Sequence, residues 1–343
     1  ARGVRHARWA GGALPLPPAR IARIVVIGDT GCRLKAADRV WQACDQPDRW
    51  PFAGIAARAA ALHPDMVLHV GDYLYRENPC PAGVEGCAGA NWGYGEAGWR
   101  ADFLDPAAPL LAAAPWTMVR GNHEECARAG EGWWRLLDPH RLIAGRDCTD
   151  PAQDRAGNHG APYAVDLGGR DRLVVLDLVA LAAARPGDPG PVDDLRGDVG
   201  RIAALTAGAR SRFVTAHYPL NAVLWASGGT DAVTIGGKVA AALGAGALPD
   251  VRAMFAGHIH FFQYARFTDR PSQLVTGFSG TEEDPAIAPA TLADAAGKPG
   301  SAPLDALTTI AGRFGYALLE RHGAAWRLTA FAPDGSVMGR FAL

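Results

Sequence analysis

The sequence predicts an α/β fold built around parallel β-strands. The β-branched run from Ile21 to Ile27 is followed by an Ala-rich segment with helical apolar spacing, 52–63, and then by the apolar run 65–70. A strand, a helix and a second strand in this order form a βαβ unit whose two strands pair in parallel. Several strand-like runs also end at a small residue followed by polar side chains, which is where open α/β sheets bind their ligands.

Length and composition limit the classes of protein that fit. The chain has 343 residues, 49% of them hydrophobic, with a formal net charge of -1. This length allows a large core, in one large α/β domain or two smaller ones. The near-neutral charge gives no reason to expect a nucleic acid partner. Because no apolar run approaches the roughly 18 residues of a membrane span, we expect no membrane segment. Composition does not indicate the oligomeric state.

The first part of the chain differs from the rest in composition. Residues 1–20 are rich in Arg and then in Pro, and they lack the apolar core of a signal peptide. We therefore expect residues 1–20 to form an N-terminal arm that precedes the folded domain.

Cysteine usage indicates the compartment. The chain contains six cysteines, which are Cys32, Cys44, Cys80, Cys87, Cys126 and Cys148. Their even number and the tight loop from Cys80 to Cys87 favour disulfides and an oxidising compartment, periplasmic or secreted. Sequential pairing is the simplest arrangement, although other pairings and buried free thiols stay open. No two of the six cysteines are separated by the two residues that are typical of a zinc knuckle.

Apolar periodicity and turn residues predict the remaining elements. Further strands are expected at 116–120, 163–167, 172–178, 212–216, 251–256 and 273–277, with antiparallel strands over 316–343. Turns are expected at Gly168-Gly169 and at 333–336, and helices at 200–209 and 231–243. Loops are expected at 76–100, 125–160, 185–200 and 280–305, the last as a surface loop or lid.

Five strand-like runs end in side chains of the kind that bind metals. They are Gly28-Asp29-Thr30-Gly31, Gly71-Asp72-Tyr73-Leu74-Tyr75, Gly121-Asn122-His123-Glu124, Val214-Thr215-Ala216-His217 and Gly257-His258-Ile259-His260. Each alone is a weak signal, because a Gly-Asp pair at a strand end is more often a turn. A carboxylate from Asp72 and a phenolate from Tyr75 at one strand end suit a hard cation such as ferric iron. Together the five runs predict a metal centre.

In this order, the five runs resemble the motifs of the metallophosphoesterase (calcineurin-like) superfamily, and specifically of its purple acid phosphatase branch. Most of that superfamily begins with Asp-x-His, whereas this chain has Asp29-Thr30-Gly31, and Tyr75 replaces the missing histidine as in purple acid phosphatases. The resemblance covers about residues 24–262. It implies a four-layer α/β/β/α sandwich with two central mixed β-sheets, in a single catalytic domain over 21–343.

The resemblance also implies a pair of metal ions. It assigns a ferric ion to Asp29, Tyr75 and His260, a divalent ion (iron, zinc or manganese) to Asn122, His217 and His258, and a bridging position to Asp72. Two carboxylates and one phenolate contribute about -3 against about +5 from the ions, and a bridging hydroxide leaves about +1. Such a site attracts the phosphate dianion of a substrate.

The implied activity is the hydrolysis of small phosphate monoesters by metal-activated hydroxide, as in an acid phosphatase. The resemblance makes His123 the general acid or a phosphate-orienting group, with Glu124 orienting its ring. The alternative for His123 is a purely structural hydrogen bond. Alternatives for the protein are a phosphodiesterase or phosphotriesterase on the same dimetal site, a redox role of the iron pair, or a non-catalytic metal-binding module.

Some features depart from the family or stay open. Substrate-facing histidines that follow the equivalent of His217 in the family are absent from 218–229. His159 either enters the pocket in their place or is an ordinary loop histidine, and His69 is expected to be buried structure. Four loop tryptophans either line a pocket rim or pack locally, and they are Trp92, Trp99, Trp133 and Trp134.

Overall fold

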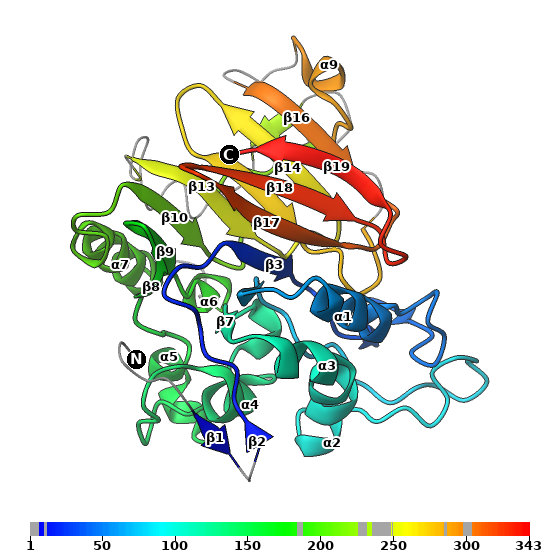
Figure 1. Ribbon diagram of the computed structural model, residues 1–343. Helices are drawn as coiled ribbons and strands as arrows, with labels where there is room; N and C mark the ends of the chain where they lie inside the picture. Colours follow the sequence, from blue (N-terminus) through cyan, green and yellow to red (C-terminus); the bar gives the residue numbers. More distant parts are fainter. Residues whose placement is uncertain are drawn as a thin grey trace.

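Two mixed β-sheets packed face to face form the centre of the fold, with helices on the outer face of each (Figure 1). The computed structural model describes residues 7–9, 12–183, 188–225, 232–234, 248, 250–284, 287–297 and 304–343.

The strands of both sheets are listed here in spatial order, as far as the described residues go. The seven-stranded sheet contains β16 (Leu304–Ile310), β14 (Phe262–Phe267), β15 (Ser272–Thr276), β13 (Val251–Ala256), β10 (Ser211–Thr215), β9 (Asp171–Val175) and β8 (Tyr163–Gly168). The six-stranded sheet contains β19 (Val337–Ala342), β18 (Ala325–Phe331), β17 (Tyr316–His322), β3 (Arg23–Ile27), β6 (Met66–His69) and β7 (Trp116–Met118). Three short hairpins are β1 (Arg8–Trp9) with β2 (Gly12–Ala13), β4 (Leu34–Lys35) with β5 (Val40–Trp41), and β11 (Val223–Trp225) with β12 (Ala232–Thr234).

Helices connect and cover these strands. The α-helices are α1 (Phe52–Ala61), α2 (Glu96–Trp99), α3 (Asp105–Ala113), α4 (Gly130–Gly132), α5 (Asp154–Gly157), α6 (Val179–Ala182), α7 (Gly190–Leu205) and α9 (Leu292–Ala295). Short 3-10 turns lie at η2 (Asn122–Glu124) and η4 (Pro151–Gln153), and π-helical turns at η1 (Arg100–Leu104) and η3 (Trp133–Leu137).

Alternation along the central strands produces the layers. In β3, Ile24 and Val26 pack into the core between the sheets, whereas Val25 and Ile27 pack against the helices of the outer face. Because side chains alternate between the faces of a strand, a strand covered on both sides has to be apolar at every position. β3 pairs in parallel with β6, and β6 with β7. The predicted four-layer α/β/β/α class with two mixed sheets is therefore confirmed.

The prediction was wrong about where α7 begins. We expected a loop at 185–200 and a helix only from 200, but α7 starts at Gly190. Pro191 is compatible with the first turn of a helix, where its missing N–H leaves no hydrogen bond unmade. Leu195 and Ile202 are buried on one face of the helix, so tertiary packing outweighs the Pro, Gly and Asp content of this segment.

Several elements escaped prediction, and one predicted helix is contradicted where it can be checked. Among the missed elements are α3, β14 and β16, the last at the end of the expected loop at 280–305. The helix expected at 231–243 has instead the short strand β12, Ala232–Thr234, near its start. This strand pairs with β11, so a hairpin contact replaces the expected helical turn. The rest of that predicted helix lies outside the described residues.

The cysteines form three sequential disulfides, which confirms the simplest predicted pairing. They are Cys32–Cys44, Cys80–Cys87 and Cys126–Cys148. Within the described ranges, no helix has the length and apolar character needed to span a bilayer.

A buried ion pair joins the two sheets. Asp171 of β9 pairs with Arg321 of β17, and it also accepts a hydrogen bond of 3.0 Å from Trp326 Nε1 of β18. The side chains of Asp171 and Arg321 are 0% and 2% exposed. Because an unpaired charge is costly in a core, each of the two charges depends on the other.

We expect Asp171→Asn to lower the free energy of unfolding by about 3 kcal/mol, because it leaves the Arg321 guanidinium buried without its counterion. Urea unfolding followed by circular dichroism measures the change. The control is Arg266→Ala, which breaks an exposed pair with Asp305 and should cost less than about 1 kcal/mol. Equal losses in the two variants would contradict the role assigned to the buried pair.

Candidate metal centre

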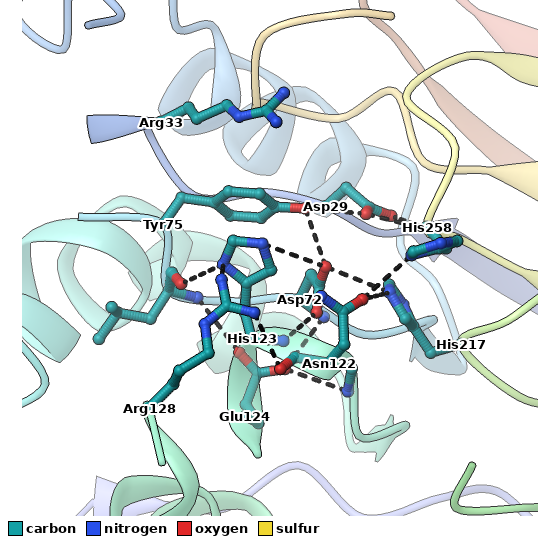
Figure 2. A network of polar contacts seen from close by, with 12 residues as sticks. Asp29, Arg33, Asp72, Tyr75, Asn122, His123, Glu124, Arg128, His217 and His258 are labelled. Carbon is teal, nitrogen blue, oxygen red and sulfur yellow. Dashed lines mark hydrogen bonds and ion pairs between the residues drawn. The ribbon is translucent and has the colours of Figure 1, made fainter. Parts of the chain in front are cut away.

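The seven predicted ligands come from loops at the carboxyl ends of five strands. Those that follow the strands β3, β6 and β7 of the six-stranded sheet are Asp29, Asp72, Tyr75 and Asn122. Those that follow the strands β10 and β13 of the seven-stranded sheet are His217, His258 and His260. Parallel strands bring their carboxyl ends to one edge of a sheet, so these loops meet between the two sheets (Figure 2).

The phenol oxygen of Tyr75 is the meeting point of the first set of side chains. Tyr75 Oη lies 3.0 Å from Asp29 Oδ1, 2.9 Å from Asp72 Oδ2 and 3.1 Å from His260 Nε2. Two carboxylates, a phenol and an imidazole therefore converge on one point. Asp29, Tyr75 and His260 are the residues that the resemblance assigned to a ferric ion, and Asp72 is the residue that it assigned to the bridging position.

The amide oxygen of Asn122 organises the second set. Asn122 Oδ1 lies 3.0 Å from His258 Nδ1 and 3.1 Å from His217 Nε2. Asp72 Oδ2 is 3.1 Å from His217 Nε2, so this one oxygen touches both the Asn122 set and the Tyr75 set. Ligand atoms of Asp72, His217 and His258 all lie within 4.8 Å of one another, a spacing that suits a shared ion.

Three of these residues have a strained backbone. Asp29, Asp72 and His258 have φ angles of 53°, 59° and 72°, in the left-handed region that non-glycine residues seldom occupy. Such conformations persist only where the surrounding structure enforces them, and they cluster at functional sites. The strand ends therefore turn sharply and point these side chains at the centre.

Glycine precedes two of the motifs because the ligand carboxylates fill the space beside it. A Cβ at Gly121 would lie 2.0 Å from Asp72 Oδ1, and a Cβ at Gly257 would lie 2.3 Å from Asp29 Oδ2. A larger residue at either position would push a carboxylate out of the centre.

Burial controls the charges of the centre. Asp29 and Asp72 are 0% and 1% exposed. Burial raises the pKa of Asp29 well above its usual value, although the charge of His217 opposes the rise. Burial also lowers the pKa of His258 to about 3 and of His260 to about 4, so both imidazoles are neutral at pH 7. Neutral imidazoles and buried carboxylates are the donors that metal ions require, and bound cations would offset the cost of the buried negative charge.

The carboxylates of the centre raise the pKa of two of the other ligands, His217 and Tyr75. Burial disfavours a charge on His217, but the nearby Asp72 carboxylate outweighs burial and raises the pKa of His217 to about 9. Burial and the charges of Asp29 and Asp72 hold the pKa of Tyr75 well above its usual value. Metal binding at this centre would therefore displace protons. The donor set fits a pair of hard or intermediate metal ions.

Glu124 fixes the backbone of the Asp72 loop. Its carboxylate accepts hydrogen bonds from the backbone N–H groups of Asp72, Tyr73, Leu74 and Gly121, at 2.9 to 3.3 Å. We expected Glu124 to orient the His123 ring, but these contacts occupy its carboxylate with backbone instead. Glu124 positions the loop that carries Asp72 and Tyr75.

The His123 ring lies beside the centre and packs against the Tyr75 ring, with 3.8 Å between the centroids and 35° between the ring planes. Its Nδ1 lies 3.0 Å from Glu77 Oε1 and 3.2 Å from the Leu74 carbonyl oxygen, which accept hydrogen bonds, and 2.6 Å from Arg128 Nη2, which can only donate one. Its Nε2 is 3.8 Å from Asp72 Oδ2. The ring therefore presents Nε2 to the centre. Arg128, which pairs with Glu77, flanks it (Figure 2).

Sequence reasoning missed three residues that support the site, namely Glu77, Asp102 and Arg128. Asp102 is fully buried, and its carboxylate accepts from Tyr75 N at 2.6 Å, from Cys32 N at 2.8 Å and from Arg76 Nε at 2.7 Å. Asp102 thereby joins the first two motif loops. No motif marks it, since it lies in η1 between two helices.

Other open questions from the sequence have structural answers. His69 is 0% exposed and bonds to Thr30 Oγ1 at 3.0 Å, as expected of a buried structural residue. His159 Nε2 lies 2.9 Å from Asp198 Oδ2 of α7, so this ring pairs with a helix. Among the four tryptophans, Trp99, Trp133 and Trp134 pack in the core beside α1 and α3, whereas Trp92 is 53% exposed. For the buried three, the local packing interpretation holds and the pocket rim does not.

The sequence and the fold are similar to those of known phosphoesterases. The family model of calcineurin-like phosphoesterases matches residues 22–262. A search of curated proteins gave no match.

Solved structures share the fold at low sequence identity. Purple acid phosphatase PPD1 from yellow lupin (Lupinus luteus) seeds has a TM-score of 0.55 and 14% identity over 96% of this chain, which spans 55% of the lupin chain. PhoD has a TM-score of 0.54 and 12% identity, over 96% of this chain and 70% of its own. GAP50, the anchor in the inner membrane complex of Plasmodium, has a TM-score of 0.50 and 11% identity, and the match covers 94% of this chain and 88% of the GAP50 chain.

We expect Glu124→Gln to lower the free energy of unfolding by about 2 kcal/mol, because the amide NH2 faces backbone N–H groups and leaves buried donors unpaired. The purified variant should also retain less metal, because the Asp72 loop loses its anchor. Urea unfolding and elemental analysis measure the two effects. Glu131→Gln, at an exposed pair with Arg135, is the control and should change neither. Full metal content in Glu124→Gln would contradict the positioning role.

Proposed function

Because this chain belongs to the calcineurin-like phosphoesterase family, whose members are metal-dependent phosphoesterases, we propose that it hydrolyses small-molecule phosphate monoesters in the manner of a purple acid phosphatase. The observation that carries the proposal is the convergence of Asp29, Asp72 and His260 on the phenol oxygen of Tyr75. A tyrosine at this point distinguishes the purple acid phosphatase pattern from the Asp-x-His pattern of most of the superfamily.

The proposed cofactors are one ferric ion and one divalent ion, which is iron, zinc or manganese. Asp29, Tyr75 and His260 would hold the ferric ion, Asn122, His217 and His258 would hold the divalent ion, and Asp72 would serve both. When bound, such a pair supplies Lewis acidity that activates water and neutralises charge on phosphoryl oxygens. The buried donors supply the oxygen and nitrogen chemistry that these ions prefer.

His123 is the proposed general acid. Its Nδ1 is engaged by Glu77 and the Leu74 carbonyl, so its Nε2 is the nitrogen that faces the centre. When the ring carries a proton on both nitrogens, the Nε2 proton can pass to the leaving-group oxygen of an ester bound there, and because burial lowers the pKa of His123 this charged form is favoured by acidic solution. Packing against the Tyr75 ring and contact with Arg128 hold the His123 ring in place. Glu124 supports this arrangement by fixing the backbone on which Asp72 and Tyr75 stand.

The proposed location is the periplasm or the exterior of the cell. The chain carries three disulfides, and disulfides persist in oxidising compartments. The proposed substrates are small phosphate esters rather than nucleic acid, since the net charge of -1 offers no general attraction to a polyanion.

We expect the purified protein to hydrolyse p-nitrophenyl phosphate faster than bis(p-nitrophenyl) phosphate. His123→Asn should lower kcat by about 10²- to 10⁴-fold, because the leaving group loses its proton donor. Steady-state kinetics on both esters, with elemental analysis of each preparation, provide the measurement. His159→Asn, at a ring that pairs with Asp198 of α7, is the control. Faster cleavage of the diester would favour the phosphodiesterase alternative, and no cleavage of any ester by the metal-loaded protein would favour a non-catalytic module.

We expect the iron-loaded protein to be pink to purple, because a phenolate bound to ferric iron gives a visible charge-transfer band. Tyr75→Phe should abolish the band while leaving the far-ultraviolet circular dichroism unchanged. Tyr73→Phe is a matched control two positions away, since the Tyr73 hydroxyl donates to the Val119 carbonyl at 3.0 Å and should not affect colour. Absorption spectra of the three proteins decide the matter, and a band that survives in Tyr75→Phe would contradict the ferric assignment.

A further inference from the structure

Arg33 is a cation beside the proposed metal centre that the mechanism above does not use. It follows the first motif and precedes the hairpin of β4 and β5. In Figure 2 the Tyr75 ring lies between His123 and Arg33, with the guanidinium near the phenol oxygen. Its positive charge opposes the rise in the pKa of Tyr75, which burial and the neighbouring carboxylates cause, and helps to lower the pKa of His260. Arg33 therefore acts electrostatically on the Tyr75 side of the centre.

The charge of Arg33 is only partly compensated. Arg33 Nη2 donates to Asp38 Oδ2 at 2.6 Å, but the same oxygen also lies 3.2 Å from Lys35 Nζ. Asp38 thus serves two cations, and the Asp284 carboxylate acts on Arg33 electrostatically without a hydrogen bond to it among the described contacts. Within the described residues, the buried Nε of Arg33 has no hydrogen-bond partner. The side chain is 20% exposed, so the guanidinium is neither sealed in the core nor free in solvent.

The backbone of Arg33 is held rigidly against the centre. The disulfide Cys32–Cys44 closes its loop, and Arg33 N donates to Gln42 Oε1 at 2.8 Å. The same Gln42 oxygen accepts from Glu282 N at 3.1 Å, and the Glu282 carbonyl in turn accepts from His260 Nδ1 at 2.9 Å. One glutamine therefore connects the Arg33 loop to the segment that orients a proposed metal ligand. Rigid support of this kind is what a binding residue needs.

Arg33 differs from the other side chains around the centre in how far its charge is compensated. On the opposite side of Tyr75, Arg128 is engaged by Glu77 and by the Asn122 carbonyl. After His217, where the family places substrate-facing histidines, this chain has Tyr218, whose ring lies 4.2 Å from that of His258. Arg33 thus contributes a cation without a full complement of partners, on the Tyr75 side of the centre.

We propose that Arg33 anchors a second oxyanion on the substrate, a carboxylate or phosphate on the alcohol side of the ester. A guanidinium binds such groups through two parallel hydrogen bonds. Arg33 makes none of the hydrogen bonds that join the seven ligands to one another, and Figure 2 shows it across the Tyr75 ring from His123, beside the ligands and not among them. This inference rests on the proposed function, and it makes phosphorylated acids and bisphosphates the preferred substrates.

The test is a binding measurement on the metal-loaded protein with two matched phosphonates that cannot be hydrolysed. Propylphosphonate carries one anionic group, and 3-phosphonopropionate carries a carboxylate in place of its terminal methyl. By titration calorimetry, we expect the wild-type protein to bind 3-phosphonopropionate about tenfold more tightly. Arg33→Ala should abolish this preference and leave propylphosphonate binding unchanged, and Arg33→Lys should retain part of it.

Two further variants separate a direct contact from a general effect of charge. Lys35→Ala removes one positive charge from the same loop and should keep the tenfold preference. Asp38→Asn frees the Arg33 guanidinium and should increase it. Equal binding of the two phosphonates by the wild-type protein would overturn the proposal, as would equal weakening of both by Arg33→Ala. A protein that shows the preference but cleaves no ester would support the anchor and refute the phosphatase activity alone.

Discussion

The placement of two carboxylates, Asp29 and Asp72, in a seam closed to water is the constraint on which this structure depends. Burying negative charge is unfavourable unless cations or hydrogen bonds compensate it. Here the partial compensation comes from a proton on the Tyr75 phenol and a positive charge on His217, and both positions suit metal ions. The fold supplies the seam because loops from both sheets end there.

The surrounding structure makes this arrangement possible by holding the backbone in unfavourable conformations. Asp29 and Asp72 turn through left-handed angles, and glycines leave space for their oxygen atoms. Glu124 and Asp102 then satisfy the N–H groups of the loops with buried carboxylates. The supporting acids thus determine the geometry, while the strand-end side chains determine the chemistry.

The sequence predicts most features that depend on neighbouring residues and few that depend on contacts between residues far apart in the chain. The strand ends could be read from apolar runs that stop at a small residue, and side chains such as His217 stood out because five such strand ends carry metal-type ligands in one order. Asp102 carries no such signal, because its function comes from contacts made only after folding. The start of α7 was missed for a related reason, since packing of Leu195 outweighs an unfavourable local composition. Whether three tryptophans near the motif loops belong to the core stayed open, because α3, one of the two helices that they pack beside, was not predicted from the sequence.

The division of the ligands between the two sheets has a mechanical consequence. Asp29 and Tyr75 belong to loops of the six-stranded sheet, and His260 belongs to a loop of the seven-stranded sheet. The other set is divided in the same way, with Asn122 on one sheet and His217 on the other. Any ion that either set holds would therefore act as a clasp across the seam. Separating the sheets would require tearing the ligands from their ion, so loading with metal and resistance of the sandwich to opening would rise together.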